Sequence, residues 1–344
     1  MSERAVEPLA SIPTAIDRLV RLDLLPNPYG PVERVIDAVS RFDGWSSTTD
    51  DPADLLRARL GAGAGVPPGW VVLANGIDEL HAMIAQWRRD HGPTVLFPPG
   101  DPNLESWLRR HSVQVELVWR GNEFALPVDP AERCLPRGAT SIVMTPNDPT
   151  GTIMTVQEAV RLSRQSALVV IDERHAAYSP RTLAPLVREF DNLVLLRTFE
   201  TFAALTAFPL AWAIAPPAIA REIAARVRPS GPARVAVVAG LAALDAEAEI
   251  KATVRRVMIE KGRLFRQLRK LSMISPPYPS WSNFLLARIE RGTSEFFVPR
   301  LAARGITVFE VENPRLPNHL RISGVSTDAT YALKQALIEI ALDL

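Results

Sequence analysis

Residues Leu193–Pro217 read LVLLRTFETFAALTAFPLAWAIAPP, and this stretch decides how the rest of the chain is interpreted. It begins with a mostly apolar run, Leu193–Thr198, and ends with a second one, Leu210–Pro216. Both runs have the length and composition of buried β-strands. The connection between them is too short for a helical crossover, so the two strands are expected to be antiparallel.

Short apolar runs alternate with helical patterns through the first two thirds of the chain. Strands are expected at Trp70–Ala74, Thr94–Phe97, Val113–Val118, Ser141–Thr145, Leu168–Asp172, Leu193–Arg197 and Leu210–Ala215. Helices are expected between them, at Ile77–Arg89, Leu104–His111, Val156–Gln165 and Leu183–Phe190. Such an alternation is typical of a mainly parallel sheet that helices cover on both faces. The sequence therefore predicts an α/β domain around one seven-stranded sheet.

A second, smaller α+β domain is expected toward the C-terminus. One long helical pattern, Ala233–Leu271, interrupted at most once, carries the chain into it. Its strands are expected at Phe284–Ile289, Ile306–Glu310 and His319–Ile322, and its helices at Ser294–Arg304 and Ala329–Leu342. Near the N-terminus two helical patterns, Val32–Arg41 and Pro52–Leu60, flank a loop, Phe42–Asp51. The predicted division is an N-terminal arm (1–45) that joins the small domain, a large domain (46–240) and the small domain (241–344).

Length and composition limit the class of protein. The chain has 344 residues, which favours two domains over one core, and 47% of them are hydrophobic. A net charge of +1 gives no electrostatic reason to expect a nucleic acid or an anionic membrane as partner. Cys134 is the one cysteine, which excludes an internal disulfide and fits a reducing compartment. No apolar run resembles a signal peptide or a membrane helix, so a cytoplasmic location is expected.

Lysine is rare and unevenly placed. The chain contains Lys251, Lys261, Lys270 and Lys334, so the first 250 residues carry no side-chain primary amine. These lysines fall on helical patterns, where their side chains are expected to face solvent. Chemistry that requires a lysine in the large domain is therefore not expected.

Six short motifs occur in order along the chain. They are NPYGP at 27–31, NGIDE at 75–79, MTPNDPTG at 144–151, VVIDERH at 169–175, RTF at 197–199 and LRIS at 320–323. Together they resemble the fold-type I enzymes that depend on pyridoxal phosphate (PLP), in particular the histidinol-phosphate aminotransferase and threonine-phosphate decarboxylase branch. The resemblance implies the fold-type I aminotransferase fold, with a seven-stranded large domain, a smaller α+β domain and a homodimer whose sites form between subunits.

The same resemblance implies that several groups that hold PLP are replaced. Thr201 stands where the family has the lysine that forms the Schiff base, and Glu200 stands at a phosphate-binding serine. Pro209 stands at the phosphate-binding arginine, and Asp148 at the asparagine that donates to the phenolic oxygen of the cofactor. A carboxylate only accepts hydrogen bonds, so Asp148 would repel that oxygen.

Other family positions keep their character or change it partly. Asp172 matches the aspartate that holds the pyridine nitrogen protonated, and Gly76 matches the loop that cradles the phosphate. Arg321 matches the arginine that binds the substrate carboxylate, and Asn283 lies in a motif similar to the family's S-x-A-N-F. His175 replaces a tyrosine that points into the family's site.

Three functions remain open on this basis. The first is a degenerate, PLP-free protein that binds or transforms a small carboxylate-containing ligand, with Asp172, His175, Glu200 and Thr201 as candidate catalytic residues. Arg321, Asp148, Gly76 and Asn283 would bind that ligand, and neither a cofactor nor a metal is expected. The second is an active PLP-dependent aminotransferase or amino-acid decarboxylase. The third is a non-catalytic dimerisation or scaffolding protein.

Structural explanations compete with these roles. Asp172 could be a relic paired with Arg174 or His175, and Glu200 with Thr201 could belong to a solvated turn. Arg321 is expected to face the cleft between the domains and to hold a carboxylate there, since a buried guanidinium is costly without an anion. That carboxylate would come from a ligand, or from Glu173, Glu200 or Asp148.

Overall fold

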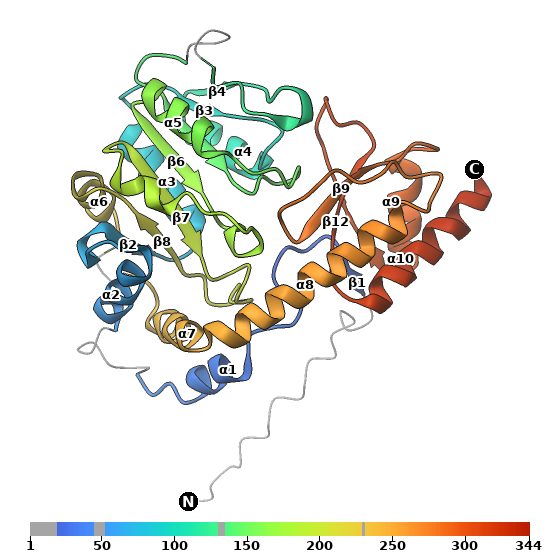
Figure 1. Ribbon diagram of the computed structural model, residues 1–344, viewed down its shortest axis with the longest axis horizontal. Helices are drawn as coiled ribbons and strands as arrows, with labels where there is room; N and C mark the ends of the chain where they lie inside the picture. The colour runs from blue at the N-terminus through green and yellow to red at the C-terminus, as the bar shows by residue number, and fades with distance from the viewer. Residues whose placement is uncertain (1–18, 45–51, 130–134, 229–230) are drawn as a thin grey trace, which may run out of the picture.

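The computed structural model describes residues 19–44, 52–129, 135–228 and 231–344. Figure 1 shows a large layered body and a smaller one, with a long helix running between them. Most of the loop expected at Phe42–Asp51 lies outside the described residues.

The large body is built on one seven-stranded sheet. Its strands are β2 (Val71–Ala74), β3 (Thr94–Leu96), β4 (Val115–Leu117), β5 (Thr140–Met144), β6 (Leu168–Asp172), β7 (Leu193–Thr198) and β8 (Ala211–Ile214). Their order is β2-β8-β7-β6-β5-β3-β4. Strand β8 is antiparallel to both neighbours, and the other pairs are parallel. The predicted fold class is confirmed, including the antiparallel pairing of the two strands at 193–215.

Helices cover both faces of this sheet because alternate strand residues point to opposite sides. Val169 and Leu195 belong to the core under α2 (Ala53–Ala64), α5 (Val156–Gln165) and α7 (Arg234–Asp245), whereas Val170 and Leu196 belong to the other core. That second core lies under α3 (Ile77–Arg88), α4 (Pro102–Arg110) and α6 (Pro217–Ala224). Strands buried on both faces explain why their sequences are almost wholly apolar.

The smaller body follows the long helix α8 (Glu247–Leu268). It contains β9 (Phe284–Arg288), α9 (Ser294–Ala303), β10 (Ile306–Thr307), β11 (Phe309–Glu310), β12 (His319–Ser323) and α10 (Thr327–Ile340). Strands β11, β12 and β9 form an antiparallel sheet, and β1 (Val20–Arg21) pairs with β10. Of the expected N-terminal arm, β1 thus contacts the small body, while α1 (Glu33–Ser40) packs on α7. The domain boundaries themselves stay predictions.

Three expected elements are divided or shortened in the structure. The helical pattern at Ala233–Leu271, for which at most one interruption is expected, has that interruption at Ala246, whose φ and ψ of −97° and 20° are not helical. The strand expected at Ile306–Glu310 divides because β10 pairs with β1 whereas β11 pairs with β12. The helix expected at Leu183–Phe190 is a short 3₁₀ segment, Ala184–Arg188, with a proline in its first turn.

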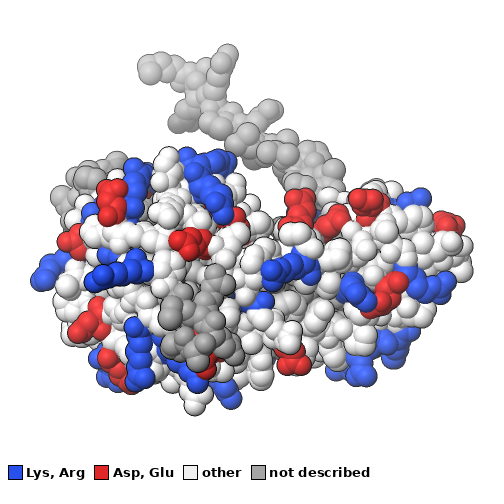
Figure 2. All heavy atoms as spheres, turned by 90° about the horizontal axis from the view of Figure 1, so that it is seen from above, with Lys and Arg blue, Asp and Glu red and all other residues white. Residues whose placement is uncertain are grey.

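Surface charge is mixed on the face shown in Figure 2, where basic and acidic side chains are interspersed over both bodies. This distribution agrees with the net charge of +1. Among the helices of the described residues, none combines the length and apolar character that crossing a membrane requires.

Candidate ligand cavity between the two bodies

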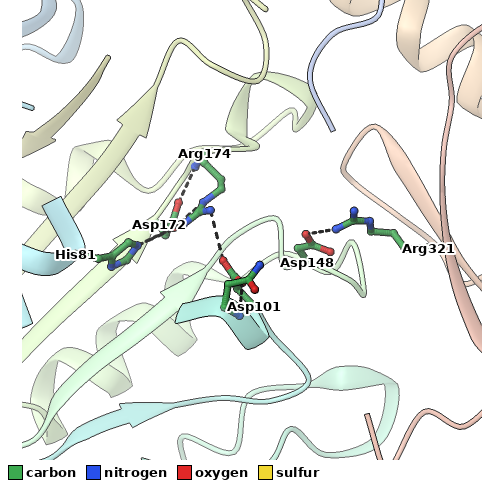
Figure 3. Close-up of polar contacts among 7 residues, drawn as sticks. His81, Asp101, Asp148, Asp172, Arg174 and Arg321 are labelled. Carbon is green, nitrogen blue, oxygen red and sulfur yellow. Dashed lines mark hydrogen bonds and ion pairs between the residues drawn. The ribbon is translucent and has the colours of Figure 1, made fainter. Parts of the chain in front are cut away.

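A cavity of about 510 Å³ lies at the carboxyl ends of β3, β5 and β6, where α/β sheets commonly bind ligands. Phe309 on β11 and Arg321 on β12 contribute from the small body. The charged residues that line it include Asp101, Arg120, Asp148, Asp172, Arg174 and Arg321. Figure 3 shows five of these residues with His81, which contacts Asp172.

Asp172 is the most deeply buried acid of the cavity wall, with 1% of its surface exposed. One carboxylate oxygen accepts from the Arg174 backbone N–H at 3.0 Å, and the other from Arg174 Nε and Nη2 at 2.8 and 2.6 Å. His81 Nε2 lies 3.0 Å from the second oxygen. Burial alone would raise the pKa of Asp172, but Arg174 and His81 outweigh it and hold that pKa well below its usual range. Asp172 is therefore a paired carboxylate.

Arg174 extends from the end of β6 over Asp172 and reaches Asp101, 3.5 Å away (Figure 3). Asp101 is itself oriented because it accepts from the backbone N–H of Asn103 at the start of α4. The carbonyl of Arg174 accepts from Thr201 Oγ1 at 2.6 Å. Arg174 is thus fixed at both its backbone and its guanidinium.

His81 is a site residue that the sequence analysis missed. It lies on α3, in the apolar face that includes Ile77 and Ile84, and is 1% exposed. The available signal was its spacing: His81 follows the apolar Ile77 by four residues, which places both on the helix face that packs on the sheet. That spacing gave no reason to associate it with Asp172, which follows it by 91 positions.

Arg321 and Asp148 form an ion pair across the cavity (Figure 3). Arg321 is 6% exposed; its Nη2 donates to the Asp23 carbonyl at 2.8 Å, and its guanidinium lies 4.1 Å from the Phe309 ring centroid. Its Nε is buried without a hydrogen-bond partner among the described residues. Burial raises the pKa of Asp148, and the charge of Arg321 opposes that shift only in part. Arg321 therefore faces the cleft and holds an internal carboxylate, one of those expected.

Glu200 lies at the N-terminus of α3, outside the cavity lining. Its carboxylate accepts from Thr198 Oγ1 at 2.9 Å and lies near the Ile77 backbone N–H, which favours its ionised form. A Cβ at Gly76, whose φ is +86°, would lie 3.2 Å from Glu200 Oε1. Glu200 is half-buried and the neighbouring Thr201 is 8% exposed, so neither belongs to a solvated turn.

Of the candidate site residues, Asp148 and Asp172 line the cavity, whereas Glu200 and His175 do not. His175 is fully buried, lies 5.7 Å from the Phe284 ring (between centroids), and has no hydrogen-bond partner at either nitrogen among the described residues. Asn283 donates to the Leu25 carbonyl instead of lining the cavity. Gly76 and Thr201 are likewise outside the lining.

Acidification should reveal the buried His175. Burial and the nearby Arg174 lower its pKa from 6.5 to about 3, so between these values the unfolded chain binds a proton that the folded chain does not. Stability should therefore fall as pH decreases from 6.5 to about 4, and His175 contributes at most about 1.4 kcal/mol per pH unit. Urea unfolding of His175→Phe should show a flatter pH dependence. His91→Gln, at an exposed position, should retain the original slope, and equal slopes in all three proteins would contradict the assignment.

The lysines do not all face solvent as expected. Lys261 on α8 is 8% exposed, its Nζ donates to the Ser280 carbonyl at 2.6 Å, and burial lowers its pKa to about 8. The expectation fails there because α8 packs against the segment before β9. None of the chain's lysines, all of which are described, lines the cavity at Asp172.

The residues present do not fit PLP at the place that the resemblance implies. The Arg174 guanidinium is bonded to the carboxylate that would hold the pyridine nitrogen. Glu200 lies near the Ile77 N–H that would face the phosphate, and Thr201, which the resemblance aligns with the family's lysine, donates to the Arg174 carbonyl. At the two places where the resemblance puts the anchoring points of the cofactor, the chain thus has a cation and an anion of its own.

Comparison with known proteins identifies the family. The model of the aminotransferase class I and II family matches residues 27–336. Histidinol-phosphate aminotransferase from Roseiflexus castenholzii is 28% identical over 95% of this chain and 91% of its own length. The enzyme of that name from Dehalococcoides mccartyi is 26% identical over 94% and 90%.

Solved structures agree on the fold. Histidinol-phosphate aminotransferase from Clostridium acetobutylicum superposes with a TM-score of 0.87 at 16% identity, over 95% of this chain and all of that one. L-threonine-O-3-phosphate decarboxylase from Porphyromonas gingivalis gives 0.79 at 17%, with the same coverage. The family model spans most of this chain, and these folds match it, so the chain belongs to the aminotransferase class I and II family.

Proposed function

We propose that this chain binds a small carboxylate-containing ligand in the cavity between its two bodies and does so without PLP. The observation that carries the proposal is Arg321, a buried guanidinium in the cavity wall whose Nε has no partner among the described residues. A guanidinium offers donors in a fixed fork that matches a carboxylate. The ligand would be an organic acid or an amino acid small enough for about 510 Å³.

The internal partner of Arg321 makes an exchange of carboxylates reasonable. Burial raises the pKa of Asp148, which means that the ion pair does not fully offset the desolvation of its carboxylate. A ligand carboxylate that displaced Asp148 would pair with Nη1, and one that reached the edge formed by Nε and Nη2 would form two parallel hydrogen bonds, which are stronger than one. Asp148 would then be free to accept from a donor on the ligand, such as an ammonium or hydroxyl group.

The names of the relatives favour a second candidate, a PLP-dependent aminotransferase or decarboxylase. It requires one lysine to approach the cavity. Lys261 is buried and has a lowered pKa, but its Nζ is bonded to Ser280 and it does not line the cavity. A third candidate, a scaffold without catalysis, predicts that no small acid binds. We also propose a homodimer, which sedimentation would test.

Isothermal titration with a panel of small organic and amino acids tests the proposal. Asp148→Asn removes the internal competitor while keeping its shape, so it should increase the affinity for the acid that binds by about tenfold, or 1.4 kcal/mol. Arg321→Gln should abolish binding. Arg110→Gln, at an exposed position on α4, is the matched control and should bind as the unaltered protein does. Unchanged affinity in both Asp148→Asn and Arg321→Gln would place the ligand elsewhere.

A further inference from the structure

We infer that the cofactor pocket of this fold is occupied from within, by Arg174 in the place of the cofactor's ring cation and by Glu200 in the place of its phosphate. The inference does not depend on carboxylate binding at Arg321. It concerns the region between Asp172 and the N-terminus of α3, which the cavity only borders at Asp172 and Arg174.

In the half of the pocket where the cofactor's ring would lie, the Asp172 carboxylate already has all the hydrogen-bond donors that it can accept. A carboxylate has about four lone-pair positions, and Asp172 already faces four nitrogens: the backbone N–H, Nε and Nη2 of Arg174, and Nε2 of His81. Arg174 supplies the positive charge that a protonated ring nitrogen would bring. A second cation at Asp172 would have to displace the guanidinium from a carboxylate that is 1% exposed.

The phosphate half is filled by an anion that belongs to the chain. The N-terminus of α3, a helix of 12 residues, favours negative charge through its free N–H groups. Glu200 places a carboxylate there: its Oε1 would lie 3.2 Å from a Cβ at Gly76, next to the Ile77 N–H, so Gly76 leaves the room that this carboxylate uses. Pro209 closes the same corner, because a Cβ at Gly76 would lie 3.3 Å from Pro209 Cβ. A phosphate dianion there would meet the Glu200 carboxylate, with the charge of Asp78 also near.

The two halves support one another. Burial raises the pKa of Glu200, and the nearby charge of Arg174 opposes that shift. Thr201, the residue after Glu200, donates to the Arg174 carbonyl. The hydrogen bond from Thr201 to the Arg174 carbonyl therefore links the segment that carries Arg174 to the segment that carries Glu200. Exclusion of the cofactor thus results from occupied positions as well as from the absence of a lysine at residue 201.

Equilibrium dialysis with pyridoxamine 5′-phosphate tests this inference, since that compound has no aldehyde and cannot react with surface lysines. The unaltered protein and Thr201→Lys should both bind it too weakly to detect. Arg174→Ala combined with Glu200→Ser opens both halves and should bind at least about tenfold more tightly. Arg181→Ala combined with Glu189→Ser changes the same residue types at exposed positions and should behave like the unaltered protein.

Two results would overturn the inference: tight binding by the unaltered protein, or binding by the folded double variant that is no tighter than that of its control. Should the double variant fail to fold, Glu200→Ser alone decides the phosphate half, because this side chain is only half-buried. With inorganic phosphate as probe, it should bind at least about tenfold more tightly than the unaltered protein, and equal affinity would refute the inference. Titrations with small acids test carboxylate binding at Arg321, and the dialysis tests the region around Arg174 and Glu200. Each of the two proposals can therefore fail without the other.

Discussion

Replacing Arg174 by alanine should lower the free energy of unfolding by about 3–5 kcal/mol. The change removes two of the four nitrogen contacts to Asp172, those of Nε and Nη2, and keeps the backbone N–H and the His81 ring. It leaves a carboxylate that is 1% exposed without its cation. Loss of one partner from a buried ion pair is costly because the remaining charge stays desolvated. Urea unfolding at neutral pH measures the effect.

The companion variant separates charge from packing. Arg174→Met with Asp172→Asn removes both charges while keeping similar volumes, so it should recover most of the loss. Arg181→Ala, at an exposed position, should change stability by no more than about 0.5 kcal/mol. If Arg174→Ala were as stable as Arg181→Ala, Arg174 would not be the partner that neutralises Asp172.

Replacing Arg321 by leucine should lower the free energy of unfolding by about 3 kcal/mol, the lower end of the range for broken buried pairs. The lower value applies because the Asp148 side chain is 15% exposed and can recover some hydration. Arg321→Leu with Asp148→Asn should regain most of the loss. If Arg321→Leu and the unaltered protein had the same free energy of unfolding in the absence of ligand, the pairing of Arg321 with Asp148 would contribute nothing to stability. Arg321 would then serve ligand binding alone.

The strands of the large body could be predicted because each is a short apolar run buried on both faces. Leu168–Asp172 was predicted to the residue, and β7 and β8 to within one or two. Divided elements were harder to predict. One interruption of the Ala233–Leu271 pattern was allowed for, but its place at Ala246 was not predicted, because the non-helical Ala246 leaves the apolar periodicity unbroken.

The candidate site was predicted in its outline but not in its contacts. Motif positions placed Asp172, Asp148 and Arg321 near one cleft, and the three residues do line one cavity. Sequence spacing does not tell which of two neighbouring side chains points inward. Arg174 enters the cavity, whereas His175, which the resemblance aligns with the family's tyrosine, packs against Phe284.

The partners of the buried charges could not be read from the sequence because they join distant segments. His81 and Asp172 are 91 positions apart, and Asp148 and Arg321 are 173 positions apart. Glu200 looked like part of a polar turn, yet the free N–H groups of a helix that begins more than a hundred residues earlier draw its carboxylate inward. These contacts depend on how the sheet assembles the strand ends.

The central claim is that this family member binds its ligand without PLP, and reductive trapping with PLP tests that claim most directly. The purified protein is incubated with PLP, reduced with borohydride, and analysed by intact mass and peptide mapping. The account predicts no stoichiometric adduct, only scattered low labelling of exposed lysines such as Lys251 and Lys270. One equivalent of PLP on a single lysine, above all on the buried Lys261, would contradict it.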